Sequence, residues 1–265
     1  GLSQPQRQRY AEVVTAKTMA ILAQLAIVIG IVLIGYWHFD NFKMGVGAAA
    51  LYLMLPYMAE MTGRVHHAVP GALLVWAVVC YRRPLAAGIF LGLAAGVIYY
   101  PFFLLPLWIS FYWQRGMARF LGGFASMLAV LTATEMFRSA DAADFWFRFQ
   151  AMFGLHTPAM DQLEGVWRVA WNPAYRIPII AGFVALSGTF ALWPARKHLG
   201  TLISCTAVIM LAAQFWDRHE GGMLMAWYLP LLLLTVFRPN LEDRIAVAVL
   251  DKGHWPRLAK FTRAA

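Results

Sequence analysis

Two short polar groups interrupt an otherwise apolar chain, and both carry side chains that acid–base chemistry uses. Their members are Glu60, Arg64, His66 and His67 in the first group, and Asp217, Arg218, His219 and Glu220 in the second. A carboxylate or an imidazole can act as a general base, and a guanidinium can hold a phosphate. If the two groups meet in the fold, they predict a site for a phosphate or a divalent metal. If they stay apart, they are ordinary charged loops.

Other chemistries lack the residues that they need. The sequence contains no P-loop, HExxH, GxSxG or CxxC motif. Cys80 and Cys205 lie in separate apolar runs, which argues against a disulfide scaffold and against a zinc site. The histidines lie in loops or at the ends of apolar runs, which argues against a b-type haem. No cofactor is predicted, apart from the divalent metal left open above.

Composition places these groups in a membrane protein. Hydrophobic residues make up 61% of the 265 residues and charged residues only 13%, whereas soluble domains carry about 25% charged residues. An all-α polytopic membrane protein is the class that this composition predicts. The net charge of +9 is dispersed as short pairs between apolar runs, an arrangement that argues against a nucleic-acid partner.

Nine apolar stretches are candidate membrane spans. They cover residues 18–37, 44–59, 69–81, 85–100, 101–113, 118–134, 177–193, 201–216 and 223–237. A span needs about 20 residues, so several of these helices must be tilted, broken or partly interfacial. Pro101 predicts two short helices that meet at a break. An interfacial belt is predicted for five tryptophans near span ends: Trp37, Trp108, Trp113, Trp193 and Trp216.

Charge is distributed unevenly between the connecting loops. Residues 40–43, 81–84, 113–119, 194–200 and 238–265 carry 13 Lys and Arg against 4 Asp and Glu; residues 55–68, 135–176 and 217–222 carry 6 against 8. The positive-inside rule assigns the first set to the cytoplasm. This predicts a multi-pass inner-membrane protein, with one transmembrane domain over 1–237 and a basic cytoplasmic tail over 238–265. Residues 1–17 are also basic, yet the alternation of nine spans would place them outside the cell. Either the first two stretches are therefore not both spans, or sequence precedes Gly1.

Three further segments carry patterns of their own. In the outer loop 135–176, residues 141–153 and 161–171 predict interfacial helices, the first capped by Asp141 or Ser139. They either pack on the bundle or cover a site for a lipid-linked substrate.

Gly88, Gly92 and Gly96 share one helix face, which either packs within the chain or binds a second copy or another membrane protein. Residues 240–250 predict an amphipathic helix on the membrane lipids.

Residues 63–134 resemble integral-membrane glycosyltransferases of the GT-C type, especially the bacterial polyprenyl-phosphate-mannose-dependent mannosyltransferases. The pattern is a helix that ends in Arg82-Arg83-Pro84, a glycine-bearing apolar helix, Tyr100-Pro101, a second apolar half and a basic turn. The resemblance implies an all-helical enzyme with an extracytoplasmic site that transfers a sugar from a polyprenyl-phosphate donor. It places the two histidines of the first polar group beside the outer mouth of that site.

The chain departs from this family at two points. Residues 97–99 are Val-Ile-Tyr where the family has a basic residue, and no acidic outer loop precedes residue 18. The leading hypothesis is a GT-C-like glycosyltransferase with the catalytic residues Glu60, Asp217 and His219. Its substrate-binding residues are expected to be Arg64, His66, His67, Tyr99, Tyr100 and Arg218. The alternative is a non-catalytic membrane subunit that scaffolds a larger complex; a transporter ranks below both.

Overall fold

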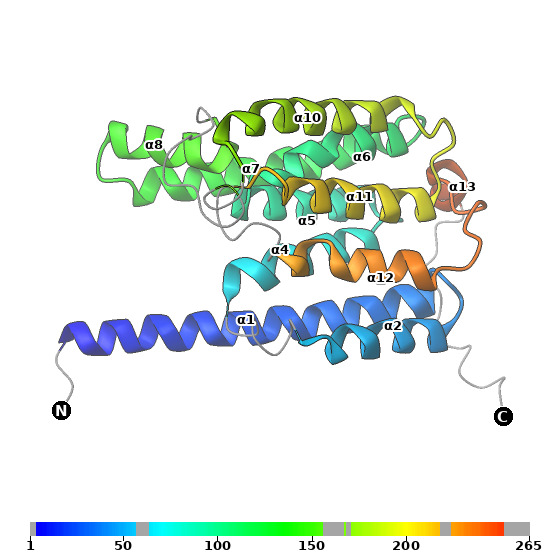
Figure 1. Cartoon of the computed structure of the whole chain (residues 1–265), viewed down its shortest axis with the longest axis horizontal. Helices are drawn as coiled ribbons and strands as arrows, with labels where there is room; N and C mark the ends of the chain where they lie inside the picture. The colour runs from blue at the N-terminus through cyan, green and yellow to red at the C-terminus, as the bar shows by residue number, and fades with distance from the viewer. Residues whose placement is uncertain (1–3, 57–63, 156–166, 168–170, 218–223, 252–265) are drawn as a thin grey trace.

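The computed structural model describes residues 4–56, 64–155, 167, 171–217 and 224–251, and it contains no strands in these ranges. The described chain is a bundle of helices (Figure 1). Its α-helices are α1 (Gln4–Trp37), α2 (Phe42–Met54), α4 (Val65–Val79), α5 (Pro84–Val97), α6 (Leu105–Tyr112), α7 (Met117–Arg138), α8 (Ala142–Phe153), α10 (Arg176–Leu192), α11 (Leu199–Ala213), α12 (Leu229–Phe237) and α13 (Ala246–Asp251). Three short 3-10 helices join them: η1 (Tyr100–Leu104), η2 (Pro173–Tyr175) and η3 (Met225–Trp227).

The all-helical prediction is confirmed, and each of the nine apolar stretches contains a described helix. Three of the described helices are long and apolar enough to cross a membrane: Arg9–Trp37, Met117–Arg138 and Pro173–Leu192. The others are shorter, because turns and prolines end them early. At 1.5 Å per residue, the 13 residues of α2 span about 20 Å, against about 30 Å of hydrocarbon. The count of nine spans therefore remains a prediction.

The described connectors fall into two groups at opposite ends of the bundle (Figure 1). One end, here called the basic end, holds the connectors between α1 and α2, α4 and α5, α6 and α7, α10 and α11, and α12 and α13. Nine described basic residues gather there: Lys43, Arg82, Arg83, Arg115, Arg119, Arg196, Lys197, Arg238 and Arg244. Only four described acidic residues accompany them: Asp40, Glu242, Asp243 and Asp251. The other end is called the aromatic end, because it holds Tyr99, Tyr100, Trp216 and Trp227.

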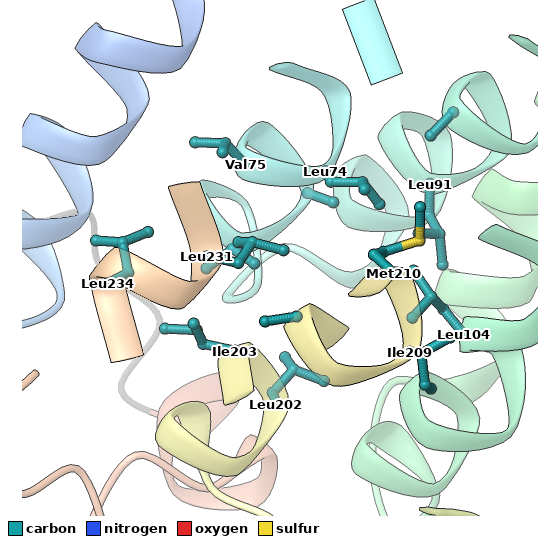
Figure 2. Close-up of a cluster of buried hydrophobic side chains, with 14 of the residues drawn as sticks. Leu74, Val75, Leu91, Leu104, Leu202, Ile203, Ile209, Met210, Leu231 and Leu234 are labelled. Carbon is teal, nitrogen blue, oxygen red and sulfur yellow. The ribbon is translucent and has the colours of Figure 1, made fainter. Parts of the chain in front are cut away.

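Apolar side chains fill the interior of the bundle and also cover much of its surface. In Figure 2, leucine, isoleucine, valine and methionine side chains from α4, α5, η1, α11 and α12 pack together. On the outside, α1 exposes Ile21 and Leu25, and α10 exposes Ile177 and Leu192. A surface of this kind is expected where hydrocarbon rather than water surrounds the protein.

The Gly88 face lies inside the molecule, against α7. A Cβ added at Gly88 would lie 2.1 Å from the carbonyl oxygen of Phe120, and one added at Gly123 would lie 2.2 Å from that of Leu85. Gly92 and Gly96 also meet α7, at Phe124 and Leu131. Of the two predicted alternatives for this face, the structure thus shows packing within the chain. Membrane-protein partners remain a prediction that would need another surface.

The predicted break at Pro101 is confirmed. Helix α5 ends at Val97, the chain turns through the 3-10 helix η1, and α6 begins at Leu105. Proline at the start of η1 lacks the amide hydrogen that a continuous helix would need. The break turns Tyr99 and Tyr100 toward the residues of the aromatic end.

Two of the predicted surface helices can be compared with the structure. Helix α8 forms as expected, and the Asp141 carboxylate caps it by accepting a hydrogen bond from the Asp144 amide at 2.7 Å. The 240–250 helix was predicted too long, because it begins only at Ala246. Asn240 instead closes a turn by accepting from the Glu242 amide, and the Leu199 amide donates to the Arg244 carbonyl. Most of the 161–171 helix lies outside the described residues.

Two of the five tryptophans predicted for the interfacial belt are buried instead. Trp108 packs in the core against Phe120, and Trp216 packs in the aromatic end. Trp113 and Trp193 are exposed near the basic end, as a belt requires. Position near a span end could not distinguish the buried from the exposed tryptophans, because burial depends on which face of the helix a neighbouring element covers.

Candidate functional site

The candidate site lies at the aromatic end, where five segments meet. These are the start of α4, the break before η1, the start of α10, the residues that follow α11, and η3. Each is a helix terminus, where the backbone leaves its regular hydrogen bonding and polar groups must find other partners. The polar side chains that gather here are therefore held by long-range contacts.

Asp217 and Tyr100 form the centre of this site. The Tyr100 hydroxyl faces the Asp217 carboxylate closely enough for the two groups to interact electrostatically. Both side chains are nearly shut off from solvent, with 4% of Tyr100 and 6% of Asp217 exposed. A carboxylate held away from water interacts more strongly with nearby charges and dipoles than it would in a solvated loop.

Arg176 brings a positive charge to the same place. It is the first residue of α10 and is 2% exposed. Its guanidinium donates to the carbonyl oxygen of Trp216 through Nη2 at 2.8 Å and through Nε at 3.3 Å. Because that carbonyl immediately precedes Asp217, the cation and the carboxylate residue belong to one buried polar unit. Burying a guanidinium costs free energy that hydrogen bonds and nearby charge must offset.

Aromatic rings surround the Asp217–Tyr100 centre. Trp216 packs 5.1 Å from Tyr100 and 5.5 Å from Phe183, measured between ring centroids. Tyr99 stacks on Tyr100 at 4.2 Å. These contacts fix the orientation of the Tyr100 ring, and with it the position of the hydroxyl that meets Asp217.

The paired histidines reach this centre through Trp227. The Trp227 indole donates to the His66 carbonyl oxygen at 3.0 Å, and its ring lies 5.5 Å from Tyr100. His67 is fully buried, whereas His66 is exposed, and their rings lie 4.4 Å apart. The segment that carries the first polar group thus packs beside the segment that carries Asp217.

Gln214 holds the chain around the second polar group. Its side-chain nitrogen donates to the Met210 carbonyl, and its side-chain oxygen accepts from the Leu224 amide, both at 3.3 Å. This contact brings residues 214 and 224 together. Asp217, which follows α11, and Trp227, which is in η3, therefore both lie near Tyr100.

The structure describes six of the nine predicted site residues. Tyr99, Tyr100 and Asp217 lie together, His66 and His67 adjoin them through Trp227, and Arg64 is exposed at the N-cap of α4. The remaining three, Glu60, Arg218 and His219, lie outside the described residues.

Four residues of this end were not among the predicted site residues: Arg176, Gln214, Trp216 and Trp227. Arg176 stands one residue before an apolar stretch, a position that is ordinary for a loop cation. Its hydrogen-bond partner is 40 residues away, so no local pattern reveals it.

No metal centre is evident in the described ranges, where no three His, Cys, Asp or Glu side chains gather as a metal site requires. A cavity of about 790 Å³ lies at the basic end and is lined in part by Trp113, Arg196 and His198. A smaller one of about 340 Å³ adjoins it beside Arg238.

Comparison with known proteins gives no family for the chain. No family model, no curated protein and no solved structure matches it. The resemblance at residues 63–134 thus has no support from these comparisons.

Proposed function

We propose that this chain is a membrane glycosyltransferase of GT-C type, or part of one. It would transfer a sugar from a polyprenyl-phosphate donor at the aromatic end of the bundle. The observation that carries the proposal is the convergence of Asp217, Tyr100 and Arg176 in an apolar helical protein. A base, a group that orients the base, and a cation are the parts that such a transfer needs.

Each residue has a role in the proposed reaction. Asp217 takes the proton from the acceptor hydroxyl, whose oxygen then attacks the anomeric carbon of the sugar. The bond between that carbon and the phosphate oxygen breaks, and the electron pair leaves on the polyprenyl phosphate. Arg176 offsets the negative charge that develops there, and Tyr100 holds the carboxylate in position. The surrounding apolar side chains keep water away, which strengthens these electrostatic interactions.

The distribution of charge suggests how the protein sits in a membrane. The basic end carries nine described basic residues against four acidic ones, so the positive-inside rule assigns it to the cytoplasm. The aromatic end then faces the outside of the inner membrane, where polyprenyl-phosphate-linked sugars are used by enzymes of the resembling family. In this orientation the chain is multi-pass and residues 238–251 are cytoplasmic.

One observation favours the alternative, a non-catalytic membrane subunit. Asp217 is almost completely buried, and two cavities of the described chain lie at the opposite, basic end. A purely structural Asp217 would stabilise the junction of η1, α10 and α11 without touching a substrate. A substitution of Asp217 therefore distinguishes the two hypotheses: it lowers the transfer rate if the chain is an enzyme, and lowers only the stability if the chain is a structural subunit.

The test is a donor-cleavage assay on the full chain reconstituted in bilayers. Labelled polyprenyl-phosphate sugars are supplied as donors together with lipid and glycan acceptors that carry free hydroxyls, and release of the sugar from the phosphate is measured. Asp217→Asn keeps the shape of the side chain but removes the base, and is expected to lower the rate about 100-fold or more. Glu242→Gln, the matched change at the basic end, should leave the rate unchanged.

Two results would contradict the enzyme hypothesis. One is the absence of cleavage by the wild-type chain with every donor sugar. The other is a rate for Asp217→Asn that equals the wild-type rate. In either case, a loss of stability in Asp217→Asn would support the structural role of the carboxylate.

A further inference from the structure

A second polar cluster lies at the basic end, far from the candidate active site. Its members are His38 after α1, Tyr81 and Arg82 between α4 and α5, and Arg244 before α13; they are called the basic-end cluster. His38 packs on Tyr81, Arg82 lies by the Tyr81 ring, and the charge of Arg244 acts on both rings, so three connectors that are distant in sequence contribute to this cluster. No role in the proposed transfer requires them.

Each member of the basic-end cluster has a buried polar atom without a hydrogen bond. The atoms are Nδ1 of His38, the hydroxyl oxygen of Tyr81, Nε of Arg82 and Nε of Arg244. The His38 and Tyr81 side chains are 3% and 1% exposed, so bulk water does not satisfy them. An unsatisfied buried polar atom destabilises the folded state, and native proteins hold few of them. Four such atoms in one cluster point to a bound group.

The backbone fixes the geometry of this cluster. His38 Nε2 donates to the Val79 carbonyl at 2.8 Å, and the His38 ring meets Tyr81 edge-to-face at 4.6 Å. The Tyr112 hydroxyl donates to the Tyr81 carbonyl. The Arg82 guanidinium carbon lies 5.9 Å from the centre of the Tyr81 ring. The unsatisfied atoms of His38 and Tyr81 are therefore held in place without a bound ligand.

The cluster offers three donors and one acceptor. The donors are the two Nε–H groups and the tyrosine hydroxyl. Because Nε2 of His38 donates to a carbonyl, Nδ1 is the acceptor; burial, with the nearby charges of Arg82 and Arg244, lowers the pKa of His38 to about 3, so the ring is neutral. Asp243 approaches Arg244 Nε at 3.5 Å, which leaves one positive charge in excess.

We infer that the basic-end cluster is a binding site for a phosphate group. Phosphate oxygens accept from the two guanidiniums and the tyrosine hydroxyl, while a hydroxyl on the phosphate, or beside it, donates to His38. Arginine suits this role because its guanidinium is planar and permanently charged. Part of the Arg244 side chain, 26%, reaches the surface, so the group enters along the arginines.

The phosphate can come from two sources: the headgroup of an anionic lipid, or a free phosphate. A lipid headgroup would reach the basic end from the leaflet that surrounds it. The two sources share the same contacts with Arg82, Arg244 and Tyr81, and differ in whether an acyl chain is needed.

The experiment measures thermal unfolding of the full chain in a non-ionic detergent. Inorganic phosphate, short-chain phosphatidylglycerol and short-chain phosphatidylcholine are added separately. A ligand in large excess over its dissociation constant should raise the unfolding midpoint by about 5 °C. A rise with phosphatidylglycerol alone identifies a lipid headgroup, and an equal rise with inorganic phosphate identifies a free phosphate. No rise with either would overturn the proposal.

Variants connect the effect to the cluster. Arg82→Gln and Arg244→Gln should each lose most of the ligand-induced rise. Arg196→Gln removes the same charge from the same end, beside the neighbouring cavity, and should keep the rise. If Arg196→Gln loses as much as Arg82→Gln, the effect is general electrostatics and the proposal fails.

Tyr81→Phe gives a readout that does not depend on the arginines or on activity. It removes only the unsatisfied hydroxyl and keeps the ring that packs on His38. Without ligand, this variant should be as stable as the wild type or more stable, because an orphaned polar atom is lost. With ligand, its rise should be smaller than that of the wild type. An unchanged rise would contradict the proposed contact.

Discussion

At the scale of the residue, the environment decides what a titratable group does. Asp217 stands in a short polar run that resembles a solvated loop, yet it lies beside the Tyr100 hydroxyl and is nearly buried. His38 likewise follows an apolar stretch and is buried by three connectors. In both cases the residue type was visible in the sequence, whereas the partners come from elements far along the chain.

His38 makes a prediction about pH. Its pKa falls from the ordinary 6.5 to about 3 because burial disfavours the charged ring. Between these values the unfolded chain binds a proton that the folded chain does not, so the free energy of unfolding decreases as pH falls. His38→Gln cannot titrate and should lose less stability between about pH 7 and about pH 5. Denaturant unfolding in phosphate-free detergent solution checks this; equal losses would show that His38 does not contribute.

At the scale of the element, close backbone approach holds α5 against α7. Gly88 and Gly123 let the two helices come near enough for a Cβ to clash with a backbone oxygen. The glycine spacing of α5 was visible in the sequence, but the partner was not, because a small-residue face fits a helix of the same chain or of another chain equally well. Only the fold assigns it to α7.

Neighbouring glycines on α7 provide a matched test of this contact. Gly123→Ala places a methyl group against the Leu85 carbonyl and should destabilise the protein by about 1–3 kcal/mol. Gly122 has nothing within 4 Å of an added Cβ, so Gly122→Ala should be neutral, or stabilising by up to about 1 kcal/mol through helix propensity. Unfolding in detergent compares the two variants. Equal effects would mean that α5 and α7 are not packed this closely.

At the scale of the whole molecule, charge and apolar surface together suggest an orientation. The apolar outer faces of α1, α7 and α10 suit hydrocarbon, and the basic end suits the cytoplasmic side. The candidate active site and the proposed phosphate site then lie on opposite sides of the membrane. Each site depends on a different set of connectors.

Cysteine labelling in intact cells tests this orientation. In a chain with Cys80→Ser, the exposed positions Asp141→Cys and Arg196→Cys are compared, because they lie at opposite ends. A membrane-impermeant maleimide should label Asp141→Cys from outside, and Arg196→Cys only after the membrane is opened. Labelling of both positions from the same side would rule out the proposed topology.

The sequence by itself determined the helical class, the break at Pro101 and the separation of basic from apolar segments, and it limited the predicted cap of α8 to Asp141 or Ser139. These features depend on local chemistry: hydropathy over one stretch, a missing amide hydrogen, or a carboxylate three residues from an unpaired amide. Only the tertiary structure decided that Arg176 meets the Trp216 carbonyl, that Gly88 faces α7, and that His38, Tyr81 and Arg244 share one cluster. Such contacts join helix ends from distant parts of the chain, and their free energy depends on burial that no single segment contains.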